Sequence, residues 1–530
     1  MDYSSKFAQA VRSHDGVALA ALLSITNPGL ATLGTSISES TLLQGLYSAF
    51  NSNKSFNKQL GKNDKLWIEV AKAHRNVAVE VAGTQNLQAA FERQLELLSA
   101  VNRAADATSG SGNSNGNQGS INSNLINSFE NDAAVAAAAG GWVVLAMSTV
   151  SKELRRLAIL ADNSRAAKQR ENSADASRKG VGIQYSEQDD SEENNLERAS
   201  RAINRSFTIC LNDRTHAKRR AVYFFFGELC KVYFHLHQKR NLIKYNLRVL
   251  ATNVPAPTTT AGGGNEGDGR QANFPKAHIA TYYFYSGVVA FIDREYAKAR
   301  SGLEPCLRLC QSYPAAASAP ALVTSNLQII MLYLIPLRLL LLTPPTAPGA
   351  EAELKLPFVL PNRTRFPALH ALYAPLLRAL RAGDLHAYRS HAYGAARKVL
   401  VRRHLAAAID RLELLVVYAL ISRVHAEIAK TGDPSRIGID TLTRALSLSA
   451  VSPQVRRRRA QQPDAGTESA DSTLPPSNEQ EDDEEEETIE DGDTIAYLVQ
   501  LISMGYIKGY VSPDNGVVVF RKTRPFVIEL

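Results

Sequence analysis

The residue types that most often carry metal or redox chemistry are sparse in this chain of 530 residues. Its four cysteines include no CxxC pair. Cys306 and Cys310 lie four residues apart, which places both on one face of a helix instead of around a zinc ion. A disulfide framework is not indicated either, so we expect a reducing, nuclear or cytoplasmic setting. The sequence predicts no metal site and no cofactor.

Motifs for catalysis and nucleotide binding are missing as well. The sequence contains no HExxH helix and no arrangement of cysteine and histidine that suggests a nucleophile. Gly262 to Gly264 resemble part of a phosphate loop, but no Lys-Ser or Lys-Thr pair follows them. We therefore expect a protein that is not an enzyme.

Charge is distributed unevenly along the chain, and this favours an anionic partner. The formal net charge is +8, although the stretch from Glu479 to Asp493 alone holds eleven acidic residues, so the remainder is far more basic. Arg456, Arg457, Arg458 and Arg459 form a short basic run just before this tract. The run fits a nuclear-import signal or a second nucleic-acid contact, and equally a solvated linker.

The elements that carry these residues are predicted to be helices. Hydrophobic residues make up 45% of the chain and aromatic residues only 7%, with long runs of Ala, Leu, Arg and Glu, which favours an all-α fold. Two apolar stretches, 133–150 and 327–342, approach the length of a membrane span. Glycines interrupt the first, and the second is short and contains Arg338, so we interpret both as buried helices and expect no membrane insertion.

Breaks in composition divide the chain into structured regions and linkers. Segments rich in Ser, Gly and Asn, or in charged residues, cannot bury enough apolar surface to fold. The predicted regions are an N-terminal helical region (1–105), a disordered linker (106–124), a helix (125–162), a second disordered linker (163–195), a helical repeat array (196–430), and a winged helix (431–530) with a disordered acidic insertion (452–492).

The most strongly patterned stretch runs from Thr281 to Cys310. Its apolar and aromatic residues recur at the spacing of a helical hairpin about 34 residues long, similar to a tetratricopeptide repeat. Gly287 supplies a small residue where two antiparallel helices meet. One such unit cannot bury its apolar face alone, so neighbouring repeats are expected on both sides.

The carboxyl end has a different pattern. Helices at 437–450 and 494–504 are followed by two short strands, 507–511 and 517–521, and Asp514, Asn515 and Gly516 form a turn signal between them. This order is typical of a winged helix. Leu498, Leu501, Ile502 and Val519 are apolar residues that serve either its own core or an interface with a partner.

A helical array that ends in a winged helix is the layout of PCI domains. The segments YYFYSGVVAFIDREYAKARSGLEPCLRLC, NLQIIMLYLIPLRLLL, GDLHAY and ISMGYIKGYVSPDNGVVVFRKTRPF narrow the resemblance. They are similar to the PCI family that comprises the partner of the GANP/SAC-type scaffold in the second transcription-export (TREX) complex and the related twelfth subunit of the signalosome. The resemblance covers about residues 196–526, and inserted loops set this chain apart from the family pattern.

This resemblance implies a scaffold subunit of a nuclear mRNA-export complex, located in the nucleus at the nuclear pore, with the cytoplasm as a second location. Its implied partners are a GANP/SAC-type PCI protein, a small acidic Dss/Sem-type protein, and RNA or DNA bound without sequence specificity. Carried onto this chain, the residues expected to touch phosphate are Lys508, Arg521, Lys522 and Arg524. A solvated surface is the alternative for these residues, and a signalosome-associated subunit that serves assembly alone is the alternative function.

Overall fold

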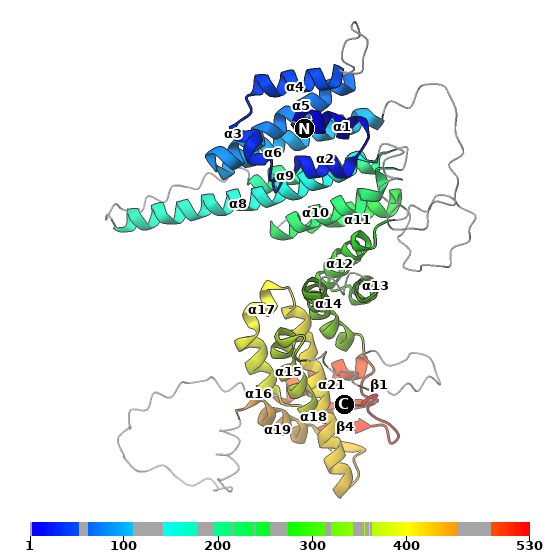
Figure 1. Cartoon of the computed structure of the whole chain (residues 1–530). Helices are drawn as coiled ribbons and strands as arrows, with labels where there is room; N and C mark the ends of the chain where they lie inside the picture. The colour runs from blue at the N-terminus through cyan, green and yellow to red at the C-terminus, as the bar shows by residue number, and fades with distance from the viewer. Residues whose placement is uncertain are drawn as a thin grey trace, which may run out of the picture. The chain divides into compact units, whose positions relative to one another are not determined.

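The protein is mostly helical and divides into two compact units (Figure 1). A computed structural model describes residues 3–51, 62–109, 141–178, 194–213, 217–236, 240–254, 274–312, 320–342, 354–355, 360, 363–452 and 489–529. The first unit is Met1–Tyr285 and the second is Ser286–Leu530. Arg456 to Arg459 and most of the acidic insertion lie outside the described residues.

The first unit is a series of helices in which each packs on its neighbours. The helices are α1 (Tyr3–Arg12), α2 (Gly16–Leu23), α3 (Leu30–Thr35), α4 (Glu39–Asn51), α5 (Lys62–Ala78), α6 (Leu87–Ser109), α8 (Val143–Arg178), α9 (Asn195–Leu211), α10 (Val222–His235) and α11 (Arg240–Asn253). Helix α6 packs on α5, α8 and α9, and α10 packs on α9 and α11. Aromatic side chains fill the core, and the rings of Trp67 and Trp142 lie 5.1 Å apart.

Charged side chains are also buried in this unit, where each has partners. Glu228 of α10 is 1% exposed and accepts hydrogen bonds from Arg155 of α8 at 2.7 Å and from Lys231 at 2.6 Å. Lys218, also 1% exposed, donates to the carbonyl oxygen of Ala105 near the end of α6. These contacts connect α8 to α10 and α6 to the segment before α10.

Helix α8 continues beyond the boundary predicted from the sequence. The expected helix ended at Asp162 and a disordered linker began at residue 163, but α8 extends to Arg178. Residues 163–178 are rich in Ala, Lys, Arg, Gln and Glu, which have high helix propensity. Such residues can continue a helix that is already packed at its start, even where one side faces solvent. Polar composition was therefore a poor guide to disorder here.

The second unit starts within α12 (Lys276–Ile292) and continues with more helices. These are α13 (Tyr296–Gln311), α14 (Pro320–Leu340), α15 (Pro367–Ala382), α16 (Leu385–Arg389), α17 (Arg397–Arg402) and α18 (Ala406–Thr431). Gly287 lies where α12 meets α13: a Cβ atom there would be 2.7 Å from Cγ of Leu303. The predicted hairpin and the close approach at Gly287 are thus confirmed.

Within the described part of the chain, one helical stretch, Val323–Leu340 of α14, is long and apolar enough to cross a membrane by length and composition. Helix α14 packs on α13 and α18, and its Ile330, Leu334 and Leu337 are buried. The hydroxyl of Tyr373 on α15 donates to the carbonyl oxygen of Leu332. These contacts fit the buried helix expected from the sequence.

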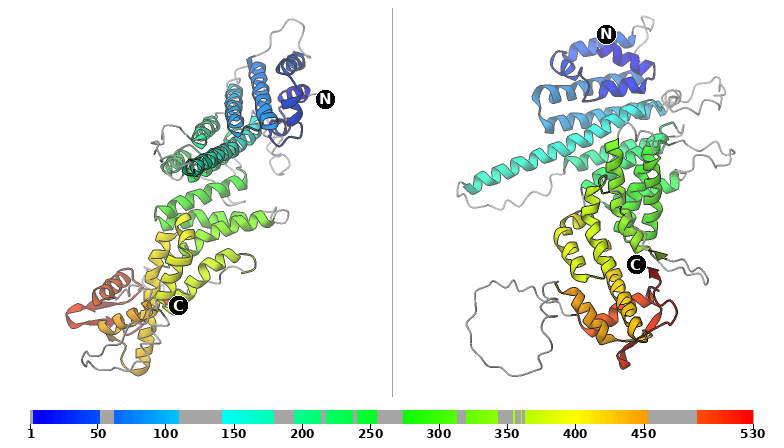
Figure 2. Two further views of the ribbon diagram at one scale, coloured as in Figure 1. Left: turned by 90° about the vertical axis from the view of Figure 1, so that its left-hand side faces the viewer. Right: turned by 60° about the horizontal axis from the view of Figure 1, so that its bottom comes forward.

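A small antiparallel sheet and two helices form the carboxyl-terminal module of the second unit, where β5 (Ile528–Glu529) also pairs in parallel with β1 (Leu354–Lys355). The elements are β2 (Arg436–Gly438), α19 (Ile439–Ala450), α21 (Asp491–Ser503), β3 (Gly509–Ser512) and β4 (Val517–Phe520), and the strand order is β2-β4-β3. The β3–β4 hairpin, which we call the wing, is red in Figure 2. Gly516 closes its turn with φ of +62°. This arrangement is consistent with the predicted winged helix.

Two boundaries of this module differ from the sequence prediction. Strand β2 was missed because it is only three residues long and its partner, β4, lies about 80 residues further along the chain. Helix α21 starts at Asp491 and not at Thr494, so the end of the predicted acidic insertion is ordered. Glu490 and Asp493 form a capping box, which stabilises the first turn of the helix.

Candidate nucleic-acid interface

The four predicted phosphate contacts come together beside the wing. Lys508 precedes β3, and the other three follow β4. The backbone N–H of Arg521 donates to the carbonyl oxygen of Lys508 at 2.9 Å, and the N–H of Lys508 donates to that of Pro525 at 2.8 Å. We call Lys508, Arg521, Lys522 and Arg524 the wing-base cluster. All four side chains are exposed, and their contact with phosphate stays a prediction.

Carboxylates offset little of the charge in this cluster. Among the described residues, Lys508, Arg521 and Lys522 form no ion pair. Asp433 is the nearby acid: hydrogen bonds from Ser435, followed by the charges of Lys522 and Arg436, lower the pKa of its carboxyl group. The cluster is therefore a region of net positive charge.

Arg436 is a further basic residue that sequence reasoning missed. It is exposed on β2 and pairs with Val519 of β4, so it lies on the sheet next to the strand that leads into Arg521 and Lys522. The missed strand hid it, because residue 436 lies some 85 positions before Arg521 in the sequence. A basic residue immediately before an Ile-Gly-Ile run was the only available signal.

Helix α21, in contrast, is unsuited to contact phosphate. It is the second helix of the α19–α21 pair, the position that inserts into the major groove in many DNA-binding helix-turn-helix proteins. Its sequence contains no Lys or Arg, and Asp491 and Asp493 lie in its first turn. Those carboxylates stabilise the helix N-terminus but repel nucleic acid. Within this module, the surface suited to phosphate is therefore the wing-base cluster and not α21.

The outer face of the sheet carries an apolar patch beside Arg436, which lies opposite Val519. Side chains alternate along a strand, and Val518 and Phe520 of β4 are buried on the inner face. Val519 therefore points outward opposite Tyr510, which is 61% exposed, and Val517 lies beside them. An exposed aromatic residue with two valines on a sheet is typical of a surface that packs on another protein. Leu498 and Leu501, by contrast, are fully buried and belong to the core.

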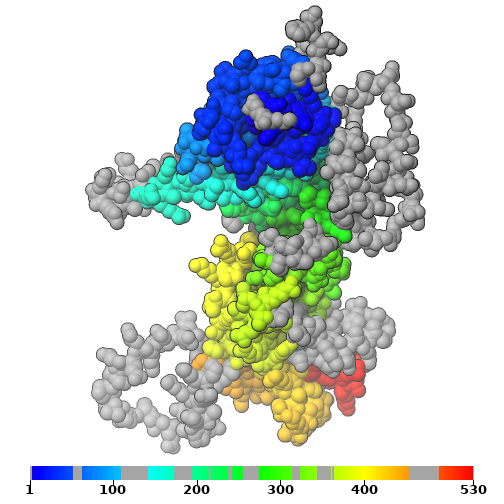
Figure 3. Space-filling model, viewed as in Figure 1, coloured from blue at the N-terminus to red at the C-terminus, as the bar shows by residue number. Residues whose placement is uncertain are grey.

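Aromatic contacts connect the wing to α18. The ring of His425 lies 5.2 Å from that of Phe520 and 5.0 Å from that of Phe526. The hydroxyl of Tyr418 donates to the carbonyl oxygen of Ile528 at 2.9 Å and accepts from its N–H at 2.8 Å. Burial raises the pKa of Tyr418 to about 12, so this hydroxyl stays protonated and can donate. The red C-terminal segment is visible beside α18 in Figure 3.

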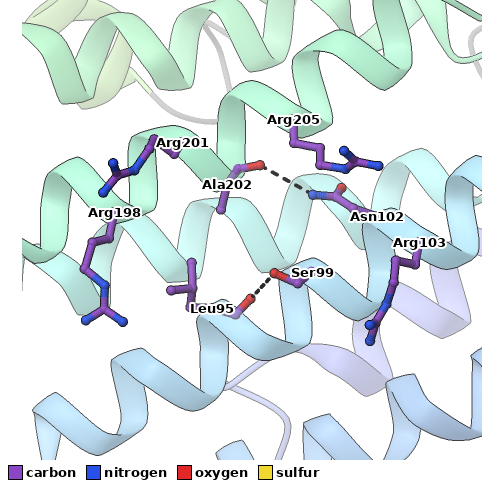
Figure 4. Close-up of a pocket in the computed structure, with 8 residues that line it drawn as sticks. All are labelled: Leu95, Ser99, Asn102, Arg103, Arg198, Arg201, Ala202 and Arg205. Carbon is purple, nitrogen blue, oxygen red and sulfur yellow. Dashed lines mark hydrogen bonds between the residues drawn. The ribbon is translucent and has the colours of Figure 1, made fainter.

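The first unit has an arginine-lined hollow of about 530 Å³ between α6 and α9 (Figure 4). Its arginines are close to carboxylates. Arg103 pairs with Glu69 at 3.2 Å, Arg198 with Glu92 at 3.7 Å, and Arg205 with Asp106 at 3.7 Å. Because nearly every cation is matched by an anion, the hollow attracts polyanions less than the wing-base cluster does.

A metal site is not found in the described part of the chain, which contains no group of three or more His, Cys, Asp or Glu that could hold an ion. Cys306 of α13 is buried next to Cys310, and none of the described cysteines forms a disulfide. A hydrogen bond with Cys310, followed by burial, raises the pKa of the Cys306 thiol. This pair lies inside the helical array and does not line the arginine-lined hollow.

The helices, the small sheet and the exposed basic cluster define the class: a helical array that ends in a winged-helix-like module, with a surface suited to a protein or a polyanion. No protein-family model matches the chain. It is 25% identical to the Protein CSN12 homolog of Schizosaccharomyces pombe over 99% of this chain and 96% of that protein. It is 27% identical to the COP9 signalosome complex subunit 12 of Eremothecium gossypii over 73% of this chain and 77% of that protein.

A further relative is the Protein CSN12 homolog of Yarrowia lipolytica, which is 31% identical over 48% of this chain. That match spans 56% of the Yarrowia protein. A relative matched over nearly the whole chain is therefore named CSN12, and one matched over 73% of it is named COP9 signalosome complex subunit 12. These names belong to one of the two branches that the sequence resemblance joined.

Proposed function

We propose that the protein is a non-catalytic scaffold subunit of a nuclear mRNA-export complex. In this proposal its C-terminal module is the winged helix of a PCI domain. It pairs with the winged helix of a GANP/SAC-type protein, and the wing-base cluster contacts the backbone of RNA or DNA. The helical array holds further partners, among them a small acidic Dss/Sem-type protein. The protein acts in the nucleus, at the nuclear pore.

The wing-base cluster is the observation that carries this proposal. Two separate segments, one before β3 and one after β4, bring its exposed cations together, and backbone hydrogen bonds from Arg521 to Lys508 and from Lys508 to Pro525 fix their spacing. Lys and Arg neutralise phosphate without reading bases, so the expected binding is independent of sequence and strongly salt-dependent. A module that only packed on protein would gain nothing from such a concentration of exposed positive charge.

The apolar outer sheet face supports the pairing part of the proposal. Tyr510, Val517 and Val519 provide an anchor and its surroundings, which is the composition expected at the centre of an interface. The cluster and the sheet face lie on the same small module but use different side chains. One can therefore be removed without the other.

The test is affinity purification of the tagged full chain from its native cells, followed by identification of the recovered proteins. Recovery of a GANP/SAC-type protein together with a small acidic Dss/Sem-type protein supports the export assignment. Tyr510→Glu is expected to abolish recovery of the PCI partner because it places a charge in an apolar interface. The quadruple variant of the wing-base cluster to Ala is expected to keep the partner and lose nucleic acid.

A second candidate is a signalosome-associated subunit that acts only in protein assembly. The name of the Eremothecium relative, COP9 signalosome complex subunit 12, favours it, as do the acidic residues in the first turn of α21. In that case signalosome subunits are recovered without a GANP/SAC-type protein. The quadruple wing-base variant then recovers the same proteins, and the wild-type complex binds no RNA.

A further inference from the structure

The segment between α16 and α18 forms an exposed projection of the second unit, which we call the α17 tip (residues 393–404; yellow in Figure 3). Residues 389–411 hold six Lys or Arg side chains and one acid, Asp410. Two of the six are engaged: Arg389 pairs with Glu413 at 2.6 Å, and Arg397 pairs with Asp410 at 3.3 Å. Most of the positive charge at this tip therefore has no local counter-charge.

Three cations at the tip face solvent without an acidic partner. Lys398, Arg402 and Arg403 are exposed, and among the described residues they form no ion pair. The arginine-lined hollow of the first unit differs, because its Arg103, Arg198 and Arg205 each have a carboxylate within 3.7 Å. Of the α17 tip and this hollow, only the tip has a clear excess of positive charge.

The tip is held firmly at its base. Leu400 and Leu405 are fully buried, and the hydroxyl of Tyr333 on α14 donates to the carbonyl oxygen of Arg403 at 3.2 Å. The backbone that carries the cations is thus fixed even though their side chains extend into solvent. A fixed backbone lowers the entropy lost when such side chains bind a ligand.

Apolar side chains are exposed between these cations. Val399 is 46% exposed and Val401 is 52% exposed, and Tyr393 at the start of the tip is 45% exposed. The guanidinium group of Arg397 lies 5.3 Å from the centre of the Tyr393 ring, so one face of that ring is already covered. Exposed apolar groups interleaved with cations suit a ligand that has both phosphates and unstacked bases. A duplex, whose bases are stacked inside, would use the cations alone.

We propose that the α17 tip is a second nucleic-acid contact that selects single-stranded over double-stranded nucleic acid. Lys398, Arg402 and Arg403 bind the phosphates, and Val399, Val401 and Tyr393 contact the bases. This inference deepens the proposed function by naming the class of nucleic acid. It does not depend on the wing-base cluster, because it uses different residues.

The tip and the wing lie near opposite ends of α18. The helix starts at Ala406, directly after the tip, and His425 near its other end contacts the wing residue Phe520. At 1.5 Å per residue these two positions are about 28 Å apart. A single strand of about 20 nucleotides is longer than this even at ~3.4 Å per nucleotide, so it can reach both surfaces.

The experiment measures binding of the full-length protein to a single-stranded RNA of about 20 nucleotides and to the corresponding duplex, by fluorescence anisotropy over a range of salt concentrations. The first variant is Lys398→Ala, Arg402→Ala and Arg403→Ala. We expect about tenfold weaker binding of the single strand, and a salt slope that is smaller by about 2, because up to three phosphate contacts are lost. The matched control removes the same charge from α13 and should change neither the affinity for the single strand nor the salt slope. It combines Lys298→Ala, Arg300→Ala and Arg308→Ala.

The second variant, Val399→Ser with Val401→Ser, tests the contact with bases. We expect single-strand binding to weaken about fivefold, because apolar contact with the bases is lost, with an unchanged salt slope and unchanged duplex binding. Equal losses for single strand and duplex would overturn the selectivity. Thermal unfolding of each variant, compared with the wild type, shows whether the fold is kept.

Two other outcomes would overturn the inference and identify what failed. If the tip variant binds RNA normally while the wing-base variant does not, the tip is no nucleic-acid site and the proposed function stands. If a glutamate-rich peptide displaces RNA from the wild type but not from the tip variant, the tip is a site for an acidic protein. If only the tip variant loses RNA, the proposed role of the wing-base cluster fails and the tip inference survives.

Discussion

The two units of this protein use polar residues in opposite ways. The first buries polar and charged side chains in its core, including His74, Lys218 and Glu228, with hydrogen bonds between helices. In the second unit the buried polar residues in the described part are only Ser449 and Thr494, and the cations of the wing base and of the α17 tip face solvent. Charge in the first unit fixes helix against helix. The second unit also joins α16 to α18 through the largely buried pair of Arg389 with Glu413, but most cations of its wing base and α17 tip are available to a ligand.

This difference separates structure from function within one chain. A buried ion pair is costly to break, because the partner left behind is stranded away from water. An exposed cation contributes little to stability but strongly affects attraction of a polyanion. Substitutions in the first unit should therefore change stability, and those at the basic surfaces of the second unit should change binding.

The largest expected effect is on the buried ion pair of the first unit. Glu228→Ala leaves Arg155 of α8, whose side chain is only 18% exposed, without its partner. We expect the free energy of unfolding of the first unit to fall by about 3 kcal/mol. Hydrogen exchange of peptides from each unit, measured on the full-length protein, localises the loss. The control Glu427→Ala breaks an exposed pair with Lys430 and should cost about 1 kcal/mol or less.

Mild acid should weaken the first unit before the second. Burial lowers the pKa of His74 and of His278 from 6.5 to about 4. The unfolded chain then takes up protons between these values that the folded chain does not, so stability is complete above pH 6.5 and falls as the pH drops towards 4. At pH 5 each histidine should cost about 2 kcal/mol. The check is hydrogen exchange of first-unit peptides at pH 7 and pH 5, corrected for the intrinsic exchange rate. Equal protection at the two pH values would contradict this prediction.

A steric change sharpens the comparison from the other side. Gly287→Ala in the second unit introduces a Cβ atom 2.7 Å from Cγ of Leu303, so α12 and α13 must shift apart. We expect a loss of about 1–2 kcal/mol, from crowding and not from charge. This loss should be independent of pH and salt, which chemical denaturation at several pH values can check. Gly432→Ala, at a position with open space around it, is the matched control.

The smallest effect on stability is expected at the wing base. Substitution of Lys508, Arg521 and Lys522 by Ala removes exposed side chains that form no ion pair within the described residues. The free energy of unfolding should change by less than about 0.5 kcal/mol. A loss above 1 kcal/mol in chemical denaturation would show that these cations support the fold.

Helical pattern and turn signals predicted much of the fold. The hairpin at Gly287, the apolar helix α14 and the wing with its turn at Gly516 each follow from local spacing. The three-residue strand β2 could not be predicted, because it forms only by pairing with β4 far along the chain. The same applies to the ion pair of Arg155 with Glu228, whose residues are 73 positions apart.

The candidate site was predictable in part. The resemblance pointed to Lys508, Arg521, Lys522 and Arg524, and the structure places them on one exposed surface. Arg436 could not be predicted as their neighbour, because only the pairing of β2 with β4 brings it close to them. The basic residues around α17 stood out in the sequence, but nothing there distinguished the paired Arg397 from the unpaired Arg402 and Arg403. Pairing depends on three-dimensional neighbours, which composition cannot supply.

The most direct test of the central claim is the salt dependence of RNA affinity for the wild type and for the variant in which Lys508, Arg521, Lys522 and Arg524 are all replaced by Ala. Each phosphate contact contributes about 0.7 to the slope of log affinity against log salt concentration for a single strand. We predict that the slope falls by about 3 in this variant while its unfolding is unchanged. A slope equal to that of the wild type would contradict the assignment of the wing base as a nucleic-acid contact.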